Sequence, residues 1–235
     1  MAELESISSK LDELRAGDPG QHLFGASHHR YEIGSPADQS ALDHIEELVG
    51  TRLPEDYRAF ITTIADGAPG PYYGIHSLGH ATGLVEDCWG AHVLGQDSPL
   101  SGDVAFRELL EGPADWDEHV ARLENDPSYP AGYERLQNIY QSEPWSHGRL
   151  PIADIGCGSW AFLVLRGSRQ GTMWVDATDG STGLYCLEVN FLTWYKRWLD
   201  DALDRVARAD FAPVNAHYSD LKFGDNPRYR LVNPL

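Results

Sequence analysis

The sequence predicts an α+β fold: a twisted, mainly antiparallel sheet packed against N-terminal and C-terminal helices, with a helical acidic insertion. The first observation is a run of short apolar segments, separated by glycine-containing turns, between residues 150 and 187. Branched and aromatic segments punctuated in this way are typical of strands. The second observation is that apolar residues recur every three or four positions near both ends of the chain, as in amphipathic helices.

Three helices are predicted in the first 65 residues. The first covers residues 3–16 and the second residues 38–49. The third begins at Pro54, because proline lacks the N–H that would be unpaired at the first helical position. Gly67 is expected to close this helix as a left-handed cap. Residues 72–78 then alternate like the start of a strand.

Residues 150–206 are the predicted core. Paired strands are expected over residues 150–165, and a glycine-flanked hairpin loop leads from them to a third strand that begins at Gly171. A fourth strand is expected at residues 184–187. Asn190 should cap a final helix that covers the sheet. The apolar residues of this helix follow a 3.6-residue period: Phe191, Trp194, Tyr195, Trp198, Leu199, Ala202, Leu203 and Val206.

Charge and composition restrict the classes of partner. Among 235 residues, 36 Asp and Glu stand against 18 Lys and Arg, which gives a net charge of −18. Phosphate-rich surfaces repel such a chain, so nucleic acid and anionic membranes are poor partners and a basic protein is a better one. The N-terminus lacks the features of a signal peptide, and no stretch approaches the ~20 apolar residues of a membrane span.

The number and spacing of the cysteines indicate a reducing compartment. Cys88, Cys157 and Cys186 are odd in number and scattered, with no Cys-x-x-Cys spacing, which does not describe a disulfide framework. Together with the missing targeting signals, this predicts a soluble protein in a reducing cytoplasm.

The acidity is concentrated in the middle of the chain. Residues 81–149 carry thirteen Asp or Glu and four Arg. Short helical patterns occur there at residues 104–110, 116–123 and 132–140. Their apolar residues are too few and too dispersed for a separate core, so we interpret the segment as an insertion between core elements. Residues 210–235 are interpreted as a tail that wraps the surface.

The histidines do not complete a familiar metal motif. His22, His28 and His29 share one loop and could bind a metal ion. No carboxylate or cysteine completes a ligand spacing, so solvated loop histidines are the favoured interpretation. His44 and Glu47 form a single His-x-x-Glu pair that is interpreted as solvated surface.

The enzyme motifs tested are absent or misplaced. The sequence from Gly156 to Ala161 matches the letters of a dinucleotide fingerprint, but that motif needs a helix after its glycines. Trp160 to Leu165 is strand-like instead. Cys157 lacks an oriented histidine and is interpreted as a structural thiol. We therefore expect no catalytic residue, no cofactor and no metal.

Two blocks of the sequence resemble the SUKH superfamily, which includes a fungal cell-wall synthesis regulator and many bacterial immunity proteins. The first block is Leu53-Pro54-Glu55-Asp56-Tyr57-Arg58-Ala59-Phe60, followed by Asp66-Gly67, Gly70-Pro71 and Gly74-Ile75. The second runs from Leu150-Pro151-Ile152-Ala153-Asp154 through Gly156-Cys157-Gly158, Gly167, Gly171 and Trp174 to Phe191, Trp194, Tyr195, Trp198 and Leu199. Their order and spacing together carry the resemblance.

The resemblance implies a non-enzymatic binding protein of α+β fold, with residues 1–235 as one domain. Bacterial members of this kind neutralise a cognate toxin by binding it in the cytoplasm, and nucleases are among these toxins. An intracellular scaffold or regulatory protein that recruits other proteins is the alternative. The sequence leaves the oligomeric state open.

A basic protein partner is expected to meet the acidic middle segment. Acidic side chains there would form a negative patch, and two tryptophans would be the aromatic anchors that interfaces favour. Solubility alone could equally explain the acids, and both tryptophans could be core residues. The predicted contact residues are Glu86, Asp87, Trp89, Asp97, Asp103, Asp115, Trp116, Asp117 and Glu118.

Overall fold

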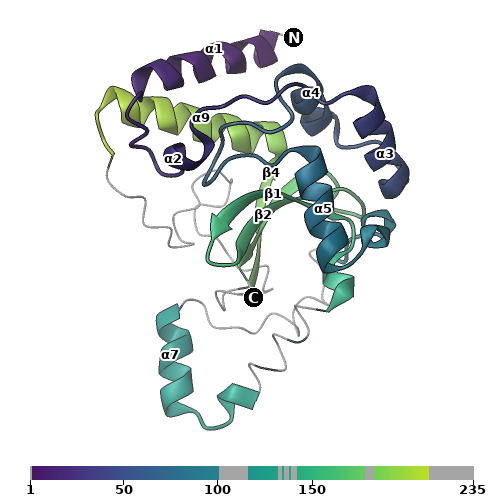
Figure 1. Ribbon diagram of the computed structural model, residues 1–235. Helices are drawn as coiled ribbons and strands as arrows, with labels where there is room; N and C mark the ends of the chain where they lie inside the picture. Colours follow the sequence, from purple (N-terminus) through teal and green to yellow (C-terminus); the bar gives the residue numbers. More distant parts are fainter. Residues whose placement is uncertain are drawn as a thin grey trace.

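The computed structural model confirms the α+β fold, with a four-stranded antiparallel sheet and helices packed on it (Figure 1). It describes residues 2–100, 116–131, 134, 138, 142–177 and 183–211. The strands are β1 (Arg149–Gly156), β2 (Ser159–Val164), β3 (Thr172–Ala177) and β4 (Gly183–Asn190), in spatial order β1-β2-β3-β4.

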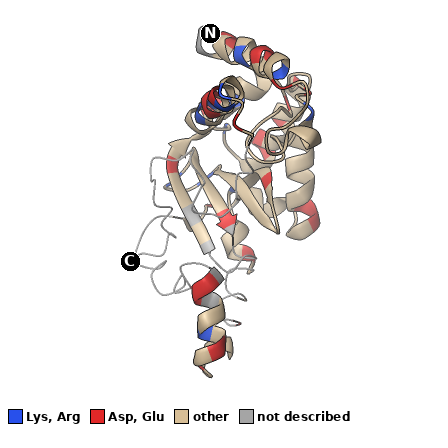
Figure 2. Ribbon diagram, turned by 90° about the vertical axis from the view of Figure 1, so that its left-hand side faces the viewer, with Lys and Arg blue, Asp and Glu red and all other residues tan. Residues whose placement is uncertain are grey.

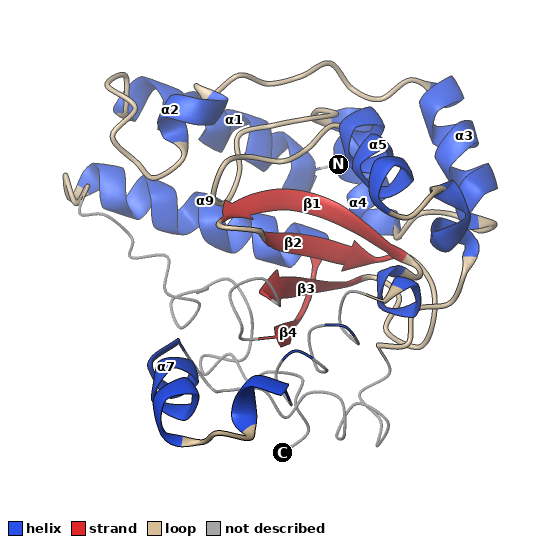
Figure 3. Ribbon diagram, turned by 60° about the horizontal axis from the view of Figure 1, so that its bottom comes forward, coloured by secondary structure: helices blue, strands red, loops and turns tan. Residues whose placement is uncertain are grey.

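The described helices occupy both halves of the chain. The α-helices are α1 (Ala2–Gly17), α2 (Ala26–His29), α3 (Gln39–Val49), α4 (Glu55–Thr63), α5 (Leu78–Cys88), α7 (Trp116–Asn125) and α9 (Phe191–Ala207). Two short 3-10 helices are η1 (Ala91–Gly95) and η2 (Glu143–Ser146). Figure 3 shows α1, α4 and α9 in one layer, with the sheet between this layer and α7.

Helix α9 covers the sheet as the sequence predicts. The Asn190 side chain accepts a hydrogen bond from the Thr193 N–H and so caps the helix. Phe191 packs edge-on against Phe60 of α4, with ring centroids 5.1 Å apart. The Asp56 carboxylate of α4 accepts a hydrogen bond from the Leu192 N–H at 2.9 Å. These contacts tie α4 and the first turn of α9 into one unit.

Both faces of the sheet are apolar, and each face has its own core. On β2, Ala161 and Leu163 face the helical layer and belong to the main core. The alternate residues Phe162 and Val164 face the other way, as the two-residue period of a strand requires. They form a second, smaller core with Trp174, Leu184, Leu100 and Trp145.

One region departs from the prediction. The prediction of a strand over residues 72–78 is wrong. In this range only Ile75 forms a β-bridge, an isolated one with Ala68. Helix α5 follows at once, capped by Ser77, whose side chain accepts from the His80 N–H. Its inner side, with Ala81 and Val85, is buried in the main core. The loop predicted to carry His22, His28 and His29 contains the short helix α2.

Two helix ends lie close to their predicted places. Pro54 is the N-cap of α4, one position before the first helical residue. The helix ends at Thr63 with Ile64 as its C-cap, so Gly67 is not the cap, although Gly67 has the expected left-handed backbone with φ 90°. The Gly156-Cys157-Gly158 sequence forms the tight turn between β1 and β2, and β2 is the predicted strand.

The middle segment is described only in part. Helix α7 confirms the predicted helical pattern at residues 116–123 and extends it to Asn125. The pattern at residues 104–110 lies outside the described residues, as does most of the pattern at 132–140 and the tail beyond residue 211. Residues 81–100 contribute Val85, Val93, Leu94 and Leu100 to the two cores.

Replacing Phe191 with alanine should destabilise the fold by about 3–5 kcal/mol, because Phe191, the first residue of α9, is fully buried against Phe60 of α4. Urea denaturation at neutral pH measures this free energy. Leu192→Ala is the matched control, since Leu192 is only partly buried, and it should cost clearly less. Equal losses in the two variants would contradict the assigned packing of α9.

Candidate functional site

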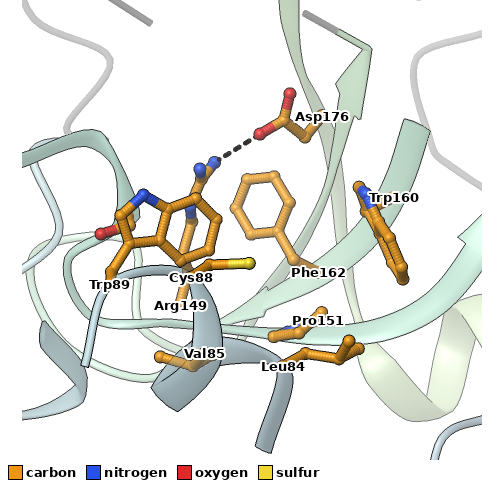
Figure 4. A pocket seen from close by; sticks show the side chains of 10 residues that line it. Leu84, Val85, Cys88, Trp89, Arg149, Pro151, Trp160, Phe162 and Asp176 are labelled. Carbon is orange, nitrogen blue, oxygen red and sulfur yellow. Dashed lines mark ion pairs between the residues drawn. The ribbon is translucent and has the colours of Figure 1, made fainter. Parts of the chain in front are cut away.

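A pocket of about 100 Å³ lies between the end of α5 and the second face of the sheet (Figure 4). Helix α5 provides Leu84, Val85, Cys88 and Trp89. These positions are adjacent or four apart, so they share one stripe of the helix. Trp89 is the C-cap residue of α5, and it is 37% exposed, so it forms an open wall of the pocket.

The sheet provides the opposite wall and the floor. Pro151 of β1 pairs with Phe162 of β2, and Trp160 of β2 pairs with Asp176 of β3. Residues paired across an antiparallel ladder lie on the same face, which brings these four side chains to the pocket. Phe162 is buried, whereas Trp160 is only partly buried and lies at the opening.

An ion pair crosses the pocket from β1 to β3. The Arg149 Nη1 atom lies 3.0 Å from the Asp176 Oδ2 atom, and the two side chains are 9% and 16% exposed. The guanidinium carbon lies 4.7 Å from the Phe162 ring centroid and 6.0 Å from that of Trp89. Arg149 therefore reaches over β2, between two aromatic rings, to its partner carboxylate (Figure 4).

The Arg149–Asp176 ion pair is largely withdrawn from water. Withdrawing two charges from water costs free energy, which their attraction offsets only when contacts are close. The Arg149 Nη1 hydrogens are not aligned with the carboxylate, so the contact is an ion pair without a well-formed hydrogen bond. The aromatic rings add a cation–π contribution. The Arg149 charge is thus satisfied within the protein.

A second carboxylate stands beside Trp160. Asp154 of β1 is its ladder partner on the side opposite Asp176, so the indole lies between two acidic residues along one row of the sheet. The Asp154 Oδ1 atom accepts a hydrogen bond from the Gly156 N–H at 2.6 Å. This bond fixes the orientation of the Asp154 carboxylate.

Three of the predicted contact residues lie together beside this pocket. Glu86, Asp87 and Trp89 are all exposed and occupy the last turn of α5. Since successive helical residues are ~100° apart, Glu86 and Asp87 lie on the side of α5 that faces away from the pocket. Trp89 is therefore a surface residue, and the interpretation as core is wrong for it.

The other predicted contact residues are not gathered at this place. Asp97 is exposed and forms an ion pair with Arg166 at 3.0 Å. Asp117 and Glu118 lie on α7, where Glu118 pairs with Arg122 of the same helix. Figure 2 shows acidic positions spread over several elements, α7 among them. Trp116 begins α7, and Asp103 and Asp115 lie outside the described residues.

The histidine loop holds no metal cluster among the residues that the structure describes. His22 Nδ1 lies 3.0 Å from the buried Asp18 carboxylate. His29 packs instead against the rings of Tyr31 and Trp198. His28 packs edge-on against Tyr73. The three side chains therefore have separate surroundings, and His29 is a partly buried packing residue rather than a solvated one.

Two histidines are held neutral by their surroundings. Burial, with a smaller effect of His28, lowers the pKa of His29 from 6.5 to about 4. Burial, with a smaller effect of His80, lowers the pKa of His76 to about 4 as well. His76 packs against Trp160 at 5.8 Å, next to the pocket.

Sequence reasoning missed most of the pocket. Trp160, Phe162 and Asp176 were assigned only to the core strands, and Arg149 was placed at the end of the acidic middle segment. One signal was available, because β2 carries large side chains at alternate positions on the face opposite Ala161 and Leu163. A strand that is apolar on both faces predicts a second covered surface.

The site is an apolar pocket with the exposed Trp89 and the partly buried Trp160 at its walls and an ion pair, Arg149–Asp176, beside it. The chain matches the model of the SMI1 / KNR4 family (SUKH-1) over residues 36–197, which is more than half of its length. It therefore belongs to this family, and the resemblance drawn from the sequence is confirmed.

Family membership indicates a broad class of function. Its members are generally non-catalytic immunity or regulatory domains. Neither curated proteins nor solved structures gave a match. None of the described helices is long and apolar enough to cross a membrane.

Replacing Asp176 with asparagine should destabilise the protein by about 2–3 kcal/mol, because the Arg149 charge would stay buried without its partner. Urea denaturation measures the loss. Asp97→Asn breaks the exposed pair with Arg166 and should cost less than about 1 kcal/mol. An Asp176→Asn variant with the same free energy of unfolding as the wild-type protein would show that the buried pair does not stabilise the fold.

Stability should also fall as the pH falls from about 6.5 to about 4. His29 and His76 stay neutral in the folded protein, whereas the unfolded chain binds protons in this window. Their contribution is complete above pH 6.5 and is lost toward pH 4, on the order of 2 kcal/mol per histidine after allowance for exposure. Chemical denaturation at several pH values measures the slope.

The His76→Gln variant tests the origin of this slope. It should lose less stability over the window than the wild-type protein, because one of the two buried histidines is gone. His44→Gln, at an exposed position of α3, is the control and should keep the full slope. An unchanged slope in His76→Gln would rule out its part in the effect.

Proposed function

We propose that this protein is a non-enzymatic immunity protein that neutralises a cognate, basic bacterial toxin in the cytoplasm by direct binding. The observation that carries the proposal is the exposed Trp89 at an apolar pocket, with Glu86 and Asp87 on the same helical turn. Family membership supports a binding role rather than catalysis. A nuclease is one candidate for the toxin, because nucleases carry basic surfaces that bind phosphates.

Charge supports a basic protein as the partner. A net charge of −18 speeds encounter with a positively charged protein and slows encounter with nucleic acid or anionic lipid. Steering of this kind acts over the whole molecule, so it does not require every acid to touch the partner. The spread of acidic positions over several elements fits this role (Figure 2).

The contact surface proposed from the sequence divides into two parts. Glu86, Asp87 and Trp89 form the α5 surface beside the pocket, and Asp117 and Glu118 form the α7 surface. We favour the α5 surface, because it combines charge with an exposed tryptophan and a cavity. Asp97 is already paired with Arg166 and is the weaker candidate for a contact.

Co-expression with candidate toxins tests the proposal. Growth should be rescued only by a cognate pair, and the two proteins should co-purify as a complex. A toxin gene beside this one would identify the first candidate. Failure to rescue growth or to form a complex with the product of such a neighbouring gene would favour the alternative of an intracellular scaffold or regulatory protein.

Variants of the α5 surface should weaken the complex in two separable ways. Charge reversal at Glu86 and Asp87 should slow association by about tenfold at low salt, because steering is lost. Trp89→Ala should raise the Kd by about 30-fold or more, mainly through faster dissociation, as for a tryptophan anchor. Surface plasmon resonance at two salt concentrations separates the two rates.

Charge reversal at Asp117 and Glu118 is the matched control on α7. It should slow association less than the α5 pair does. A larger effect from α7, together with a neutral Trp89→Ala, would place the interface on α7 and contradict the preference for α5.

A further inference from the structure

We infer that the pocket between α5 and the sheet receives one apolar side chain of the partner, next to a Lys or Arg that meets the acidic rim. This inference rests on the proposed function, because it supposes a protein partner. It adds the chemistry of the anchor and the place where the anchor enters.

The size and lining of the pocket determine the first half of the inference. A volume of about 100 Å³ is far more than a single water needs and suits one aliphatic or aromatic side chain. Leu84, Pro151 and Phe162 contribute apolar surface. Among the described residues that line the pocket, Arg149 is the only cation, and it is already paired with Asp176. An anionic side chain would therefore lose water without gaining a free cation.

The rim determines the second half. Trp160 lies at the opening, and Asp154 is its ladder partner on the side opposite Asp176, which Arg149 already neutralises. Glu86 and Asp87 are exposed on the side of α5 that faces away from the pocket, so they add to the negative field around it. A cation beside the anchor would meet the Asp154 carboxylate on the sheet side, within the negative field of the α5 acids. The indole faces of Trp89 and Trp160 would also favour a cation over an anion.

The same charges argue against a second copy of this chain as the occupant. Two molecules of net charge −18 repel each other, and their pockets carry the same acidic rim. A basic partner is attracted by both features. Charge complementarity therefore selects a partner of opposite sign.

Capped dipeptides test the inference without a toxin. We would titrate Ac-Phe-Lys-NH₂, Ac-Phe-Glu-NH₂ and Ac-Gly-Lys-NH₂ into the full-length protein and follow the indole N–H signals by NMR. Signals are assigned with Trp89→Phe and Trp160→Phe variants. Ac-Phe-Lys-NH₂ should shift the Trp89 and Trp160 signals and bind about fivefold more tightly than Ac-Phe-Glu-NH₂. Ac-Gly-Lys-NH₂ should bind least.

A variant that fills the pocket provides the control for location. Cys88→Phe adds a ring to the α5 wall and should abolish the shifts. His44→Phe introduces the same ring at an exposed helical position away from the pocket and should leave them unchanged. Trp89→Ala removes a wall instead of filling the space, so it gives an independent loss of binding if Cys88→Phe is unstable.

Three results would overturn the inference: shifts that persist in Cys88→Phe, equal binding of the Lys and Glu dipeptides, or no shift at either tryptophan. A wild-type dimer in sedimentation that Cys88→Phe dissociates would also overturn it in favour of a second copy. If the wild-type protein rescues growth but no dipeptide shifts the tryptophan signals, the proposed immunity function stands and the apolar anchor is rejected.

Discussion

The arrangement of this protein depends on a sheet whose two faces are both apolar. On β2, Ala161 and Leu163 point to one side and Phe162 and Val164 to the other, and all four are buried. Water must be excluded from both faces, and each face needs its own cover. Helix α9 covers the first face with a full aromatic stripe, so that side is closed. On the second face, Leu100 and the η2 residue Trp145 are the described residues from outside the sheet that join its core, and the pocket lies beside α5.

Helix α5 contacts both the main core, which α9 covers, and the pocket on the second face of the sheet. Its inner residues Leu78, Ala81 and Val85 belong to the main core, whereas Leu84, Cys88 and Trp89 face the pocket. One amphipathic helix thus serves two surfaces of different character. Gly148 helps to fix this junction: a Cβ there would lie 2.6 Å from the Gln96 carbonyl oxygen, so the chain passes close to the segment after η1 before it enters β1.

Sequence reasoning reached the helical layer but not the pocket, for physical reasons. Helix α9 has one buried stripe and a capping asparagine, so local pattern and tertiary packing agree. Helix α5 was missed because Gly79 and Gly83 weaken its intrinsic helix preference, and its formation depends on packing instead. The pairing of Trp160 with Asp154 and Asp176 depends on strand register, which no local pattern in the sequence reveals.

The Arg149–Asp176 pair explains how an apolar pocket can exist in so acidic a protein. An unpaired carboxylate on β3 would draw water and cations onto the second face of the sheet, and an unpaired arginine would attract the acids of α5. By neutralising each other above Phe162, the two side chains leave the pocket floor apolar. The acids that remain effective are those on the rim, where water keeps them charged. The pocket floor thus provides apolar contacts, and the acids around it provide charge. A change in those acids can alter which partner is attracted without disturbing the core that holds the fold.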